Sequence, residues 1–290
     1  MVKTVSSQLM QPQFNAGLMD LKNFHFSVDV DYVPGSEGGL EPIFEMCERL
    51  KLKPTFFITG KFAQVYPDQV RECKRRGYEL GTHGWLHGEG PDEDFGEASL
   101  EEQRRLLAIS RDEVERASGI RPRIFRAPNL WMNEFTLSAL EQEGYLIDSS
   151  VPTRRFDLGM GQIQDPRYFM APLKPYFPSH HHMGKEGQGR ILELAPSAFF
   201  VPINMSALRV LGMRSVLWAI RRVHARSPLL VFYCHPAEFV HPEKLSFEED
   251  VPKRHREGIG PQYIAVVEQM IESIFSLGYQ SRFMSEWISS

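Results

Sequence analysis

The chain has 290 residues, of which 42% are hydrophobic and 24% are charged, and its formal net charge at pH 7 is −4. This length allows one large domain with a buried core, and the composition is that of an ordinary globular protein rather than a disordered or fibrous one. Because the chain has no strong basic excess, we expect no nucleic-acid partner. We predict a single catalytic domain over residues 1–290.

The cysteines and the N-terminus favour a reducing compartment. Cys47, Cys73 and Cys234 are odd in number and form no C-x-x-C pair, so neither a disulfide framework nor a thiolate metal site is indicated. Residues 1–22 form an N-terminal extension that lacks the apolar segment of a signal peptide. No apolar run reaches the roughly 18 residues that a membrane span needs. We therefore expect a cytoplasmic protein.

Strands and helices alternate regularly through the first half of the chain. Short apolar runs that favour strands are followed by segments whose apolar residues recur with helical spacing. Glycine follows several predicted helices, as is typical of helix ends. We predict strands over 24–30, 54–60, 78–83, 123–128 and 145–150, and helices over 39–52, 67–77, 98–118 and 133–144.

The second half begins with an interruption of this rhythm. Residues 151–190 are rich in proline, glycine and histidine, which indicates a long functional loop, and we treat 151–225 as an inserted loop and helix subregion. Strands over 190–195, 229–235 and 279–284 and helices near 204–224 and 261–276 follow. Alternation of this kind predicts an α/β fold with parallel strands. Since no G-x-G-x-x-G occurs, seven or eight strands favour a barrel over a doubly wound sheet.

Ionisable side chains follow five of the predicted strands. Asp29 and Asp31 are two apart, so they point to the same side, where two negative charges require a cation or a shared proton nearby. The carboxyl ends of parallel strands share one rim, where the active sites of such barrels lie. The other candidates at this rim are His83 with His87, Arg126, Asp148 and His235.

The spacing of His83 and His87 is suited to metal binding. Residues four apart on one helical turn or tight loop place both imidazoles on one side. Two histidines and one carboxylate leave open positions on a Zn²⁺-like ion, which is the arrangement of catalytic sites. The same ligand set also occurs in Fe(II) oxygenases, although their all-β fold disagrees with the periodicity of this chain.

Taken in order, these motifs resemble those of the polysaccharide deacetylase family, the NodB-homology carbohydrate esterases. The resemblance runs from about residue 24 to 150 and resumes at 229–240. It implies a distorted (β/α)7–8 barrel of the NodB-homology type, here with a long inserted loop region near 151–190. In two places the chain departs from the family, because Gly84 stands where Ser or Thr is usual and Asn129 where Tyr or Gly is frequent.

The resemblance also implies a role for each motif residue. Asp29 corresponds to the catalytic base, in a D-x-D variant of the usual adjacent pair, and Arg126 to the residue that holds it, for which we expect a bidentate contact. His235 corresponds to the catalytic acid, and Asp148 is our candidate for the carboxylate behind it, with Asp157 as the alternative. The implied metal ligands are Asp31, His83 and His87.

The expected activity is metal-dependent hydrolysis of an N-acetyl or other N-acyl group on an amino sugar of a surface polysaccharide or its precursor. Zn²⁺ is the expected ion, with Co²⁺, Ni²⁺, Fe²⁺ or Mn²⁺ as alternatives. Opening of a cyclic amide or imide is a second hypothesis, and a carbohydrate-binding protein without catalysis is a third. The last is disfavoured because base, ligands, holding arginine and acid all have counterparts in the chain.

Other residues carry weaker predictions. Trp85, Pro128, Asn129 and Trp131 adjoin rim motifs and are candidate substrate contacts, although the tryptophans could equally pack in the core. The histidines of 180–182 are expected to be solvated. The helix near 204–224 is either an ordinary barrel helix or a basic, apolar face that rests on a membrane surface beside a lipid-linked sugar. A homo-oligomer remains open.

Overall fold

A parallel sheet forms the centre of the molecule. The structure is a computed structural model that describes residues 11–86, 95–155, 166–246 and 258–289. Within them, seven strands pair side by side in the order β12-β2-β3-β4-β5-β6-β9, and an eighth, β13, pairs with the start of β2. The strands are β2 (Asn23–Val30), β3 (Thr55–Ile58), β4 (Glu79–Thr82), β5 (Ile124–Phe125), β6 (Ile147–Asp148), β9 (Leu192–Glu193), β12 (Leu229–Cys234) and β13 (Gln280–Ser281).

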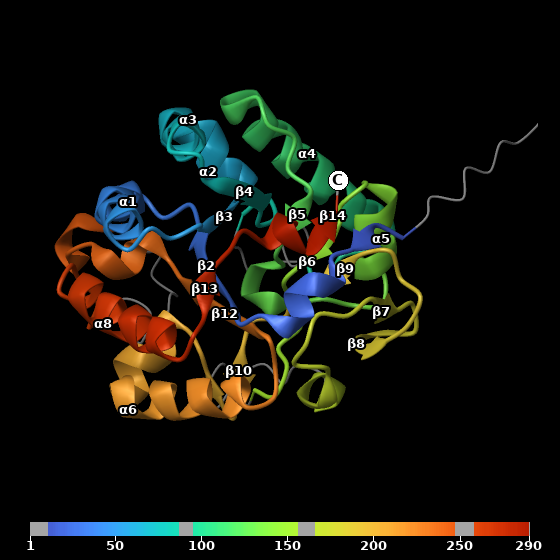
Figure 1. Ribbon diagram of the computed structural model, residues 1–290. Coiled ribbons are helices and arrows are strands. Elements are labelled where there is room, and N and C mark those ends of the chain that lie inside the picture. Colours follow the sequence, from blue (N-terminus) through green and yellow to red (C-terminus); the bar gives the residue numbers. More distant parts are fainter. Residues whose placement is uncertain (1–10, 87–94, 156–165, 247–257, 290) are drawn as a thin grey trace, which may run out of the picture.

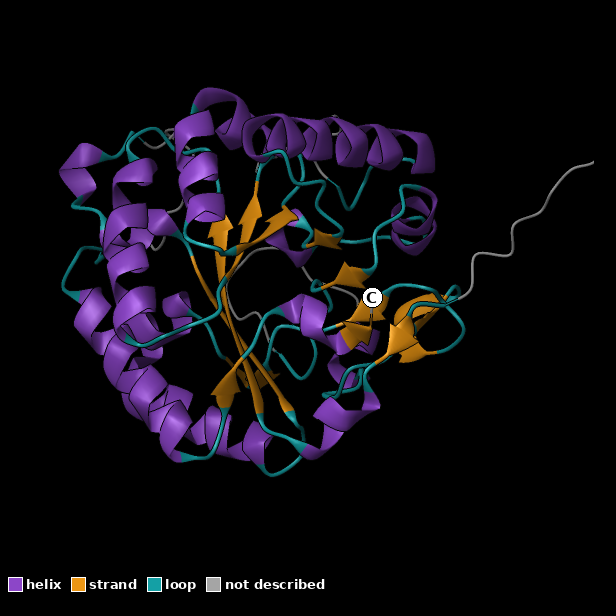
Figure 2. Ribbon diagram, turned by 45° about the horizontal axis from the view of Figure 1, so that its top comes forward, coloured by secondary structure: helices purple, strands orange, loops and turns teal. Residues whose placement is uncertain are grey.

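The sheet curls into a partial barrel, and the long helices surround its outer face (Figure 1, Figure 2). This arrangement agrees with the predicted α/β barrel. The helices are α1 (Leu40–Arg49), α2 (Gly60–Val65), α3 (Pro67–Arg75), α4 (Leu100–Ser118), α5 (Thr136–Gln142), α6 (Met205–His224) and α8 (Tyr263–Ser276). None of the helices in the described ranges is both long enough and apolar enough to cross a membrane.

Short elements replace regular helices around the predicted insertion. Two hairpins are formed there, by β7 (Pro178–Ser179) with β8 (His182–Glu186) and by β10 (Ala198–Phe199) with β11 (Val201–Pro202). A further pair, β1 (Gln13–Phe14) with β14 (Ile288–Ser289), joins the two ends of the described chain. The 3-10 turns are η1 (Ala16–Asp20), η2 (Ser36–Gly39), η3 (Pro128–Leu130), η4 (Pro166–Met170), η5 (Pro236–Phe239), η6 (Pro242–Lys244) and η7 (Met284–Trp287).

Side chains of β2 point alternately to the core outside the sheet, where the helices pack, and to the barrel interior. Phe24, Phe26 and Val28 share a buried apolar cluster with residues of α1, α6 and α8, outside the sheet. The intervening residues point to the opposite face because side chains alternate along a strand. Ser27 and Asp29 on that face are buried and polar. One strand therefore supplies both the outer core and the polar lining of the barrel.

The amino-terminal end of the barrel interior is filled by apolar side chains. Trp287 and Met284 on η7 are fully buried and pack with Leu18, Phe57 and Ile124. The indole N–H of Trp287 donates a hydrogen bond of 2.8 Å to Nε2 of His25. This plug leaves the carboxyl end of the strands as the end where polar side chains gather.

Isolated hydrogen bonds, rather than paired strands, connect the two edges of the curled sheet. Between β9 and β12, the backbone N–H of Ser197 donates to the carbonyl oxygen of Val231 at 3.1 Å. The backbone N–H of Val231 donates in turn to Oγ of Ser197 at 2.9 Å. Next to this junction, α6 packs against β12 through buried residues that include Leu208, Val216 and Ile220.

Candidate active site

The predicted site residues come from neighbouring strands of the sheet. Asp29 lies near the end of β2 and Asp31 directly after it, while His83 follows β4, Arg126 follows β5 and His235 follows β12. All of these strands run parallel to β2 or to its neighbours. Their carboxyl ends therefore deliver the five side chains to one rim of the barrel.

Asp29 and Arg126 form a buried ion pair at this rim. Nη1 of Arg126 lies 2.6 Å from Oδ1 of Asp29, and the side chains are 0% and 4% exposed, respectively. Arg126 also donates from Nη1 to Oγ of Ser27 at 2.9 Å, from Nη2 to Oγ of Ser149 at 2.8 Å and from Nε to the carbonyl oxygen of Ser149 at 2.9 Å. The expected bidentate contact is therefore wrong, because Nε and Nη2 donate to Ser149 and only Nη1 donates to the carboxylate.

The charge of Arg126 decides the protonation state of Asp29. Burial is the largest single influence on the pKa of Asp29 and raises it. The positive charge of Arg126, together with His83 and His235, lowers the pKa by more than burial raises it, so the pKa lies below its usual value. Rings on either side hold the guanidinium, whose carbon lies 4.2 Å from the ring centre of Phe57 and 5.3 Å from that of Tyr233. Asp29 is therefore an ionised carboxylate that can accept a proton.

Asp31 has an oxygen without a hydrogen bond in this arrangement. Its Oδ1 is buried and finds no hydrogen-bond partner among the described residues. That oxygen lies 3.6 Å from Nε2 of His83, and Oδ2 lies 3.8 Å from Nε2 of His235. Burial raises the pKa of Asp31 above its usual value, although both histidines act in the other direction. A cation beside Asp31 would offset this cost of burial.

His83 is oriented by the backbone of the neighbouring strand. Its Nδ1 lies 2.8 Å from the carbonyl oxygen of Arg126, and a carbonyl only accepts, so Nδ1 carries the proton and Nε2 faces Asp31. Histidines that bind metals typically donate the N–H of their other ring nitrogen to an oxygen in this way. An imidazole nitrogen and a carboxylate oxygen are donors that suit Zn²⁺ and related divalent ions. His83 and Asp31 therefore fit the predicted metal site.

The third predicted metal ligand, His87, lies outside the described residues, as does Asp157, the alternative candidate for the carboxylate behind His235. The ranges that the structure does describe contain no group of three histidine, cysteine, aspartate or glutamate side chains placed to hold a metal ion. The ligand set with His87 thus stays a prediction from the sequence.

His235 is held by a carboxylate that the sequence analysis missed. Its Nδ1 lies 3.2 Å from Oε2 of Glu238 on η5, and the same oxygen accepts the backbone N–H of His235 at 2.9 Å. Burial acts to lower the pKa of His235, but Glu238, Asp31 and Asp29 outweigh it and raise the pKa to about 9. The assignment of Asp148 to this position is therefore wrong. Glu238 could have been identified from its position three residues after His235 in "HPAE", because a 3-10 turn brings residues i and i+3 together.

Asp148 belongs instead to a second buried carboxylate pair. It ends β6, accepts a hydrogen bond from Oγ of Ser150 and interacts with Glu193 on β9. Burial raises the pKa of both carboxyl groups, most strongly that of Glu193, on which the charge of Asp148 acts in the same direction. The pair joins two strands and lies beside Ser149, which binds Arg126. Its contacts place Asp148 in the wall that supports the site.

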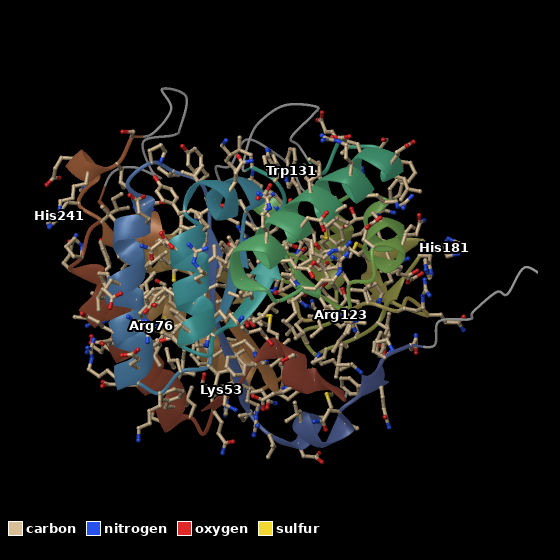
Figure 3. All side chains as sticks on the ribbon, turned by 90° about the horizontal axis from the view of Figure 1, so that it is seen from above. Lys53, Arg76, Arg123, Trp131, His181 and His241 are labelled. Atoms are coloured by element: carbon tan, nitrogen blue, oxygen red, sulfur yellow. The ribbon has the colours of Figure 1, made fainter. Side chains whose placement is uncertain are left out.

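The candidate substrate contacts lie around η3. Pro128 is buried, whereas Asn129 and Trp131 are partly exposed, and Figure 3 labels Trp131. Asn129 has a positive φ of 55°, a conformation that asparagine tolerates better than most residues. Gly84 has a φ of 69°, and a Cβ there would lie 2.8 Å from Cγ of Pro128. A larger side chain at position 84 would therefore be both strained and in contact with Pro128.

The remaining aromatic and histidine candidates have other surroundings. Trp85 is half-buried and packs against the buried cluster that contains Phe95 and Leu107. His180 and His181, the latter labelled in Figure 3, are exposed. With residues that include Arg167 and Met183, they line a cavity of about 200 Å³. That cavity contains none of the rim residues described above.

The loop after β2 rests directly on the loop after β12. Gly39 on η2 approaches the backbone of η5 so closely that a Cβ on it would lie 2.0 Å from the carbonyl oxygen of Pro236. Pro236 adjoins His235, and the loop after β2 begins with Asp31. The two loops that carry these side chains are thereby packed against each other.

Comparisons with known proteins identify related sequences. Residues 25–147 match the family model described as polysaccharide deacetylase. The chain is 27% identical over 106 residues to the peptidoglycan-N-acetylmuramic acid deacetylase PdaC of Bacillus subtilis, covering 37% of the chain and 22% of that protein. It is 25% identical over 112 residues to the peptidoglycan-N-acetylglucosamine deacetylase of Bacillus cereus, covering 38% and 39%. The chain thus spans well under half the length of these relatives.

Solved structures extend the likeness to most of the chain. A family 4 carbohydrate esterase from Streptomyces lividans in complex with acetate has a TM-score of 0.51 at 13% identity, covering 91% of this chain and 93% of that one. A family 4 pseudoenzyme from Bacillus anthracis has a TM-score of 0.56 at 13% identity, covering 93% and 66%. At such identities these matches concern the fold alone. The resemblance predicted from the motifs is thereby confirmed: residues 25–147 have the sequence pattern of polysaccharide deacetylases, and the fold around them is that of family 4 carbohydrate esterases.

Proposed function

We propose that this chain is a metal-dependent hydrolase that removes an N-acetyl or other N-acyl group from an amino sugar of a surface polysaccharide or its precursor. One observation carries the proposal. An ionised, buried Asp29 lies on the same strand face as Asp31, whose Oδ1 has no hydrogen-bond partner in the described residues and lies 3.6 Å from His83. A bound cation would give that oxygen the partner that it lacks.

Asp31, His83 and His87 would hold the metal ion, with Zn²⁺ as the first choice. When bound, such an ion lowers the pKa of a water molecule toward neutrality and polarises the acyl carbonyl. Side chains of this chain supply the two proton transfers that accompany the attack of water on the acyl carbon and the departure of the amine.

Asp29 accepts the proton of the attacking water. A base is useful only if it is ionised, and Arg126 keeps Asp29 in that form despite its burial. The two serines that bind the other donors of Arg126 fix the guanidinium, so Asp29 has little freedom to move.

His235 donates a proton to the leaving nitrogen. Glu238 accepts from Nδ1, so the acidic proton is carried by Nε2, which lies 3.8 Å from Oδ2 of Asp31 and therefore faces the site. The raised pKa of His235 keeps the imidazolium populated at neutral pH, as an acid requires. Base and acid thus occupy different strand ends, β2 and β12, on either side of Asp31.

Acetate release tests the proposal. The purified chain would be incubated with N-acetylated amino sugars, their oligomers and peptidoglycan fragments, before and after removal of metal by a chelator and after return of Zn²⁺. We expect release that stops with the chelator and resumes with the ion. Cyclic imides in the same assay test the second hypothesis.

Asp29→Asn and Asp112→Asn form a matched pair for this assay. Both change one carboxylate to an amide, but Asp112 lies exposed on α4, away from the rim. Only Asp29→Asn should abolish release. Absence of release from every N-acyl substrate, or release that Asp29→Asn leaves intact, would refute the proposed function.

A further inference from the structure

Exposed apolar side chains gather on one part of the surface. Nine large apolar side chains are exposed in the described residues, and five of them lie on η4, the β10–β11 hairpin and α6. Figure 1 shows β10 beside α6. The five are Met170, Phe200, Val210, Leu211 and Trp218, with 67%, 47%, 69%, 50% and 40% of their surface exposed. Isolated exposed apolar residues are ordinary, whereas a contiguous group indicates an interaction site.

Phe200 is the tip of the hairpin and is held there at a conformational cost. Ala198 pairs with Pro202 and Phe199 with Val201, so Phe200 is the single residue of the turn. Its φ is 60°, a region that bulky side chains rarely adopt. Phe200 is 47% exposed in this strained conformation, and strain at an exposed aromatic residue points to a role in binding.

Aromatic contacts join the hairpin to its neighbours. The ring of Phe199 lies 5.1 Å from that of Phe200 and 5.8 Å from that of Trp218 on α6. On the other side, the ring of Phe169 on η4 lies 5.6 Å from that of Phe200. The three elements therefore form one continuous surface, which we call the docking face.

The charge of the docking face is opposite in sign to that of the whole chain. Residues 194–235 contain five arginines and no lysine, aspartate or glutamate, although the chain has a net charge of −4. Arg214, Arg221, Arg222 and Arg226 are exposed, and no salt bridge joins them to an acidic side chain within the described ranges. Arg222 lies 5.4 Å from the ring centre of Trp218, and Arg226 lies 4.8 Å from that of Phe199. Positive charge and apolar surface are thus interleaved.

We propose that the docking face binds the surface of a bilayer that carries anionic phospholipids. Aromatic side chains partition into the boundary between headgroups and acyl chains, and arginines beside them pair with phosphate groups. An acidic protein would match the arginines, but it would leave Phe200 and Trp218 without an apolar environment. A bilayer satisfies both features.

Docking in this way would bring the active-site rim close to the membrane. Asn204, two residues beyond the hairpin, donates from Nδ2 to the hydroxyl of Tyr233 at 2.7 Å. The ring of Tyr233 lies 6.0 Å from that of His235. Under the proposed function, on which this step rests, the substrate would be an amino sugar carried by a membrane lipid.

Vesicle binding by the wild-type chain is the first test, and it does not depend on activity. We expect sedimentation with vesicles of phosphatidylcholine and phosphatidylglycerol, at least about tenfold weaker binding to phosphatidylcholine alone, and weaker binding as salt is raised. Phospholipids brominated on their acyl chains should quench tryptophan fluorescence, and Trp218→Phe should remove the quenched component. Failure to bind anionic vesicles, or binding without quenching, would overturn the proposal.

Two matched pairs of variants locate the binding surface. Phe200→Ser is compared with Phe135→Ser, since Phe135 is 40% exposed on another face. Arg221→Glu/Arg222→Glu on α6 is compared with Arg71→Glu/Arg75→Glu on α3, which changes the net charge equally. The first member of each pair should weaken binding about tenfold or more, and the second should not. Equal losses within a pair would overturn the proposal, and if a variant fails to fold, the quenching of the wild-type chain decides.

Discussion

Buried polar side chains differ in charge between the two ends of the barrel interior, although one strand, β2, supplies a side chain to each end. His25 and Asp29 lie on the same face of β2 and are 0% and 3% exposed. His25, at the plugged end, is hydrogen-bonded by Trp287 and by the carbonyl oxygen of Arg282, and burial lowers its pKa to about 4. Asp29, at the open end, is kept ionised by Arg126.

Burial of a polar side chain therefore does not by itself identify a functional site in this protein. At the plugged end both ring nitrogens of the histidine have a partner, and the side chain is neutral. At the open end an ionised carboxylate lies beside Asp31, whose Oδ1 lacks a hydrogen bond in the described residues. Retained charge distinguishes the two ends, because the buried histidine at the plugged end is neutral whereas Asp29 at the open end is ionised.

The largest expected effect is that of Asp29→Asn. Turnover should fall by at least about 10²-fold because the base is lost, while metal content should stay the same because Asp31 and His83 are intact. Steady-state kinetics and metal analysis measure the two quantities. His25→Gln is the control at the other end of β2 and should leave turnover unchanged. Near-normal turnover of Asp29→Asn would assign the base to another residue.

His235→Asn should have an effect that depends on the leaving group. Hydrolysis of an amide should slow by about 10²-fold, since the leaving nitrogen must be protonated. An activated aryl ester should lose only a few-fold, because its leaving oxygen needs little protonation. The ratio of kcat values for the two substrates is the measurement. Equal losses would show that His235 orients the site without donating the proton.

At the plugged end, His25 should make stability depend on pH. Its pKa is about 4 in the folded state and about 6.5 when unfolded, so the unfolded state binds more protons between these values. The free energy of unfolding should therefore fall as the pH is lowered through this window, by about 2 kcal/mol at pH 5 relative to pH 7. Urea denaturation of wild type and His25→Gln isolates this contribution. Parallel pH profiles for the two proteins would contradict it.

The smallest expected effect is that of Glu238→Gln. Without the carboxylate, the imidazolium of His235 loses the partner that raises its pKa, and we expect a loss of about tenfold in kcat with little change in KM. Because His235 acts in its protonated form, the alkaline limb of the pH-rate profile should move to lower pH. An unchanged limb would mean that Glu238 only packs against the turn.

The sequence predicted the parts of the fold and site that depend on local periodicity. The strand before Asp29, the helices of the first half and the facing of Asp29 and Asp31 all follow from spacing along the chain. Strand lengths were overestimated, since β5, β6 and β9 have two residues each in the curled sheet. The short helix α2 was not expected.

The parts that could not be predicted depend on contacts between distant segments. Ser27 and Ser149 both bind Arg126, yet they are 122 positions apart and have no distinctive pattern around them. Glu238 was recognisable only once the chain after His235 was known to form a 3-10 turn. The plug formed by Trp287 requires the end of the chain to pack against its beginning. Sequence spacing carries no information about such pairings.

The close packing of Gly39 against Pro236 means that the geometry of the site depends on a backbone contact as well as on charged groups. Hydrogen takes the place of a methyl group where the two loops touch, with 2.0 Å between the position of that methyl group and an oxygen atom. The separation of His235 from Asp31 therefore depends on how closely the two backbones approach each other. An alanine at position 39 would act as a wedge, separating the two halves of the site without altering any titratable group.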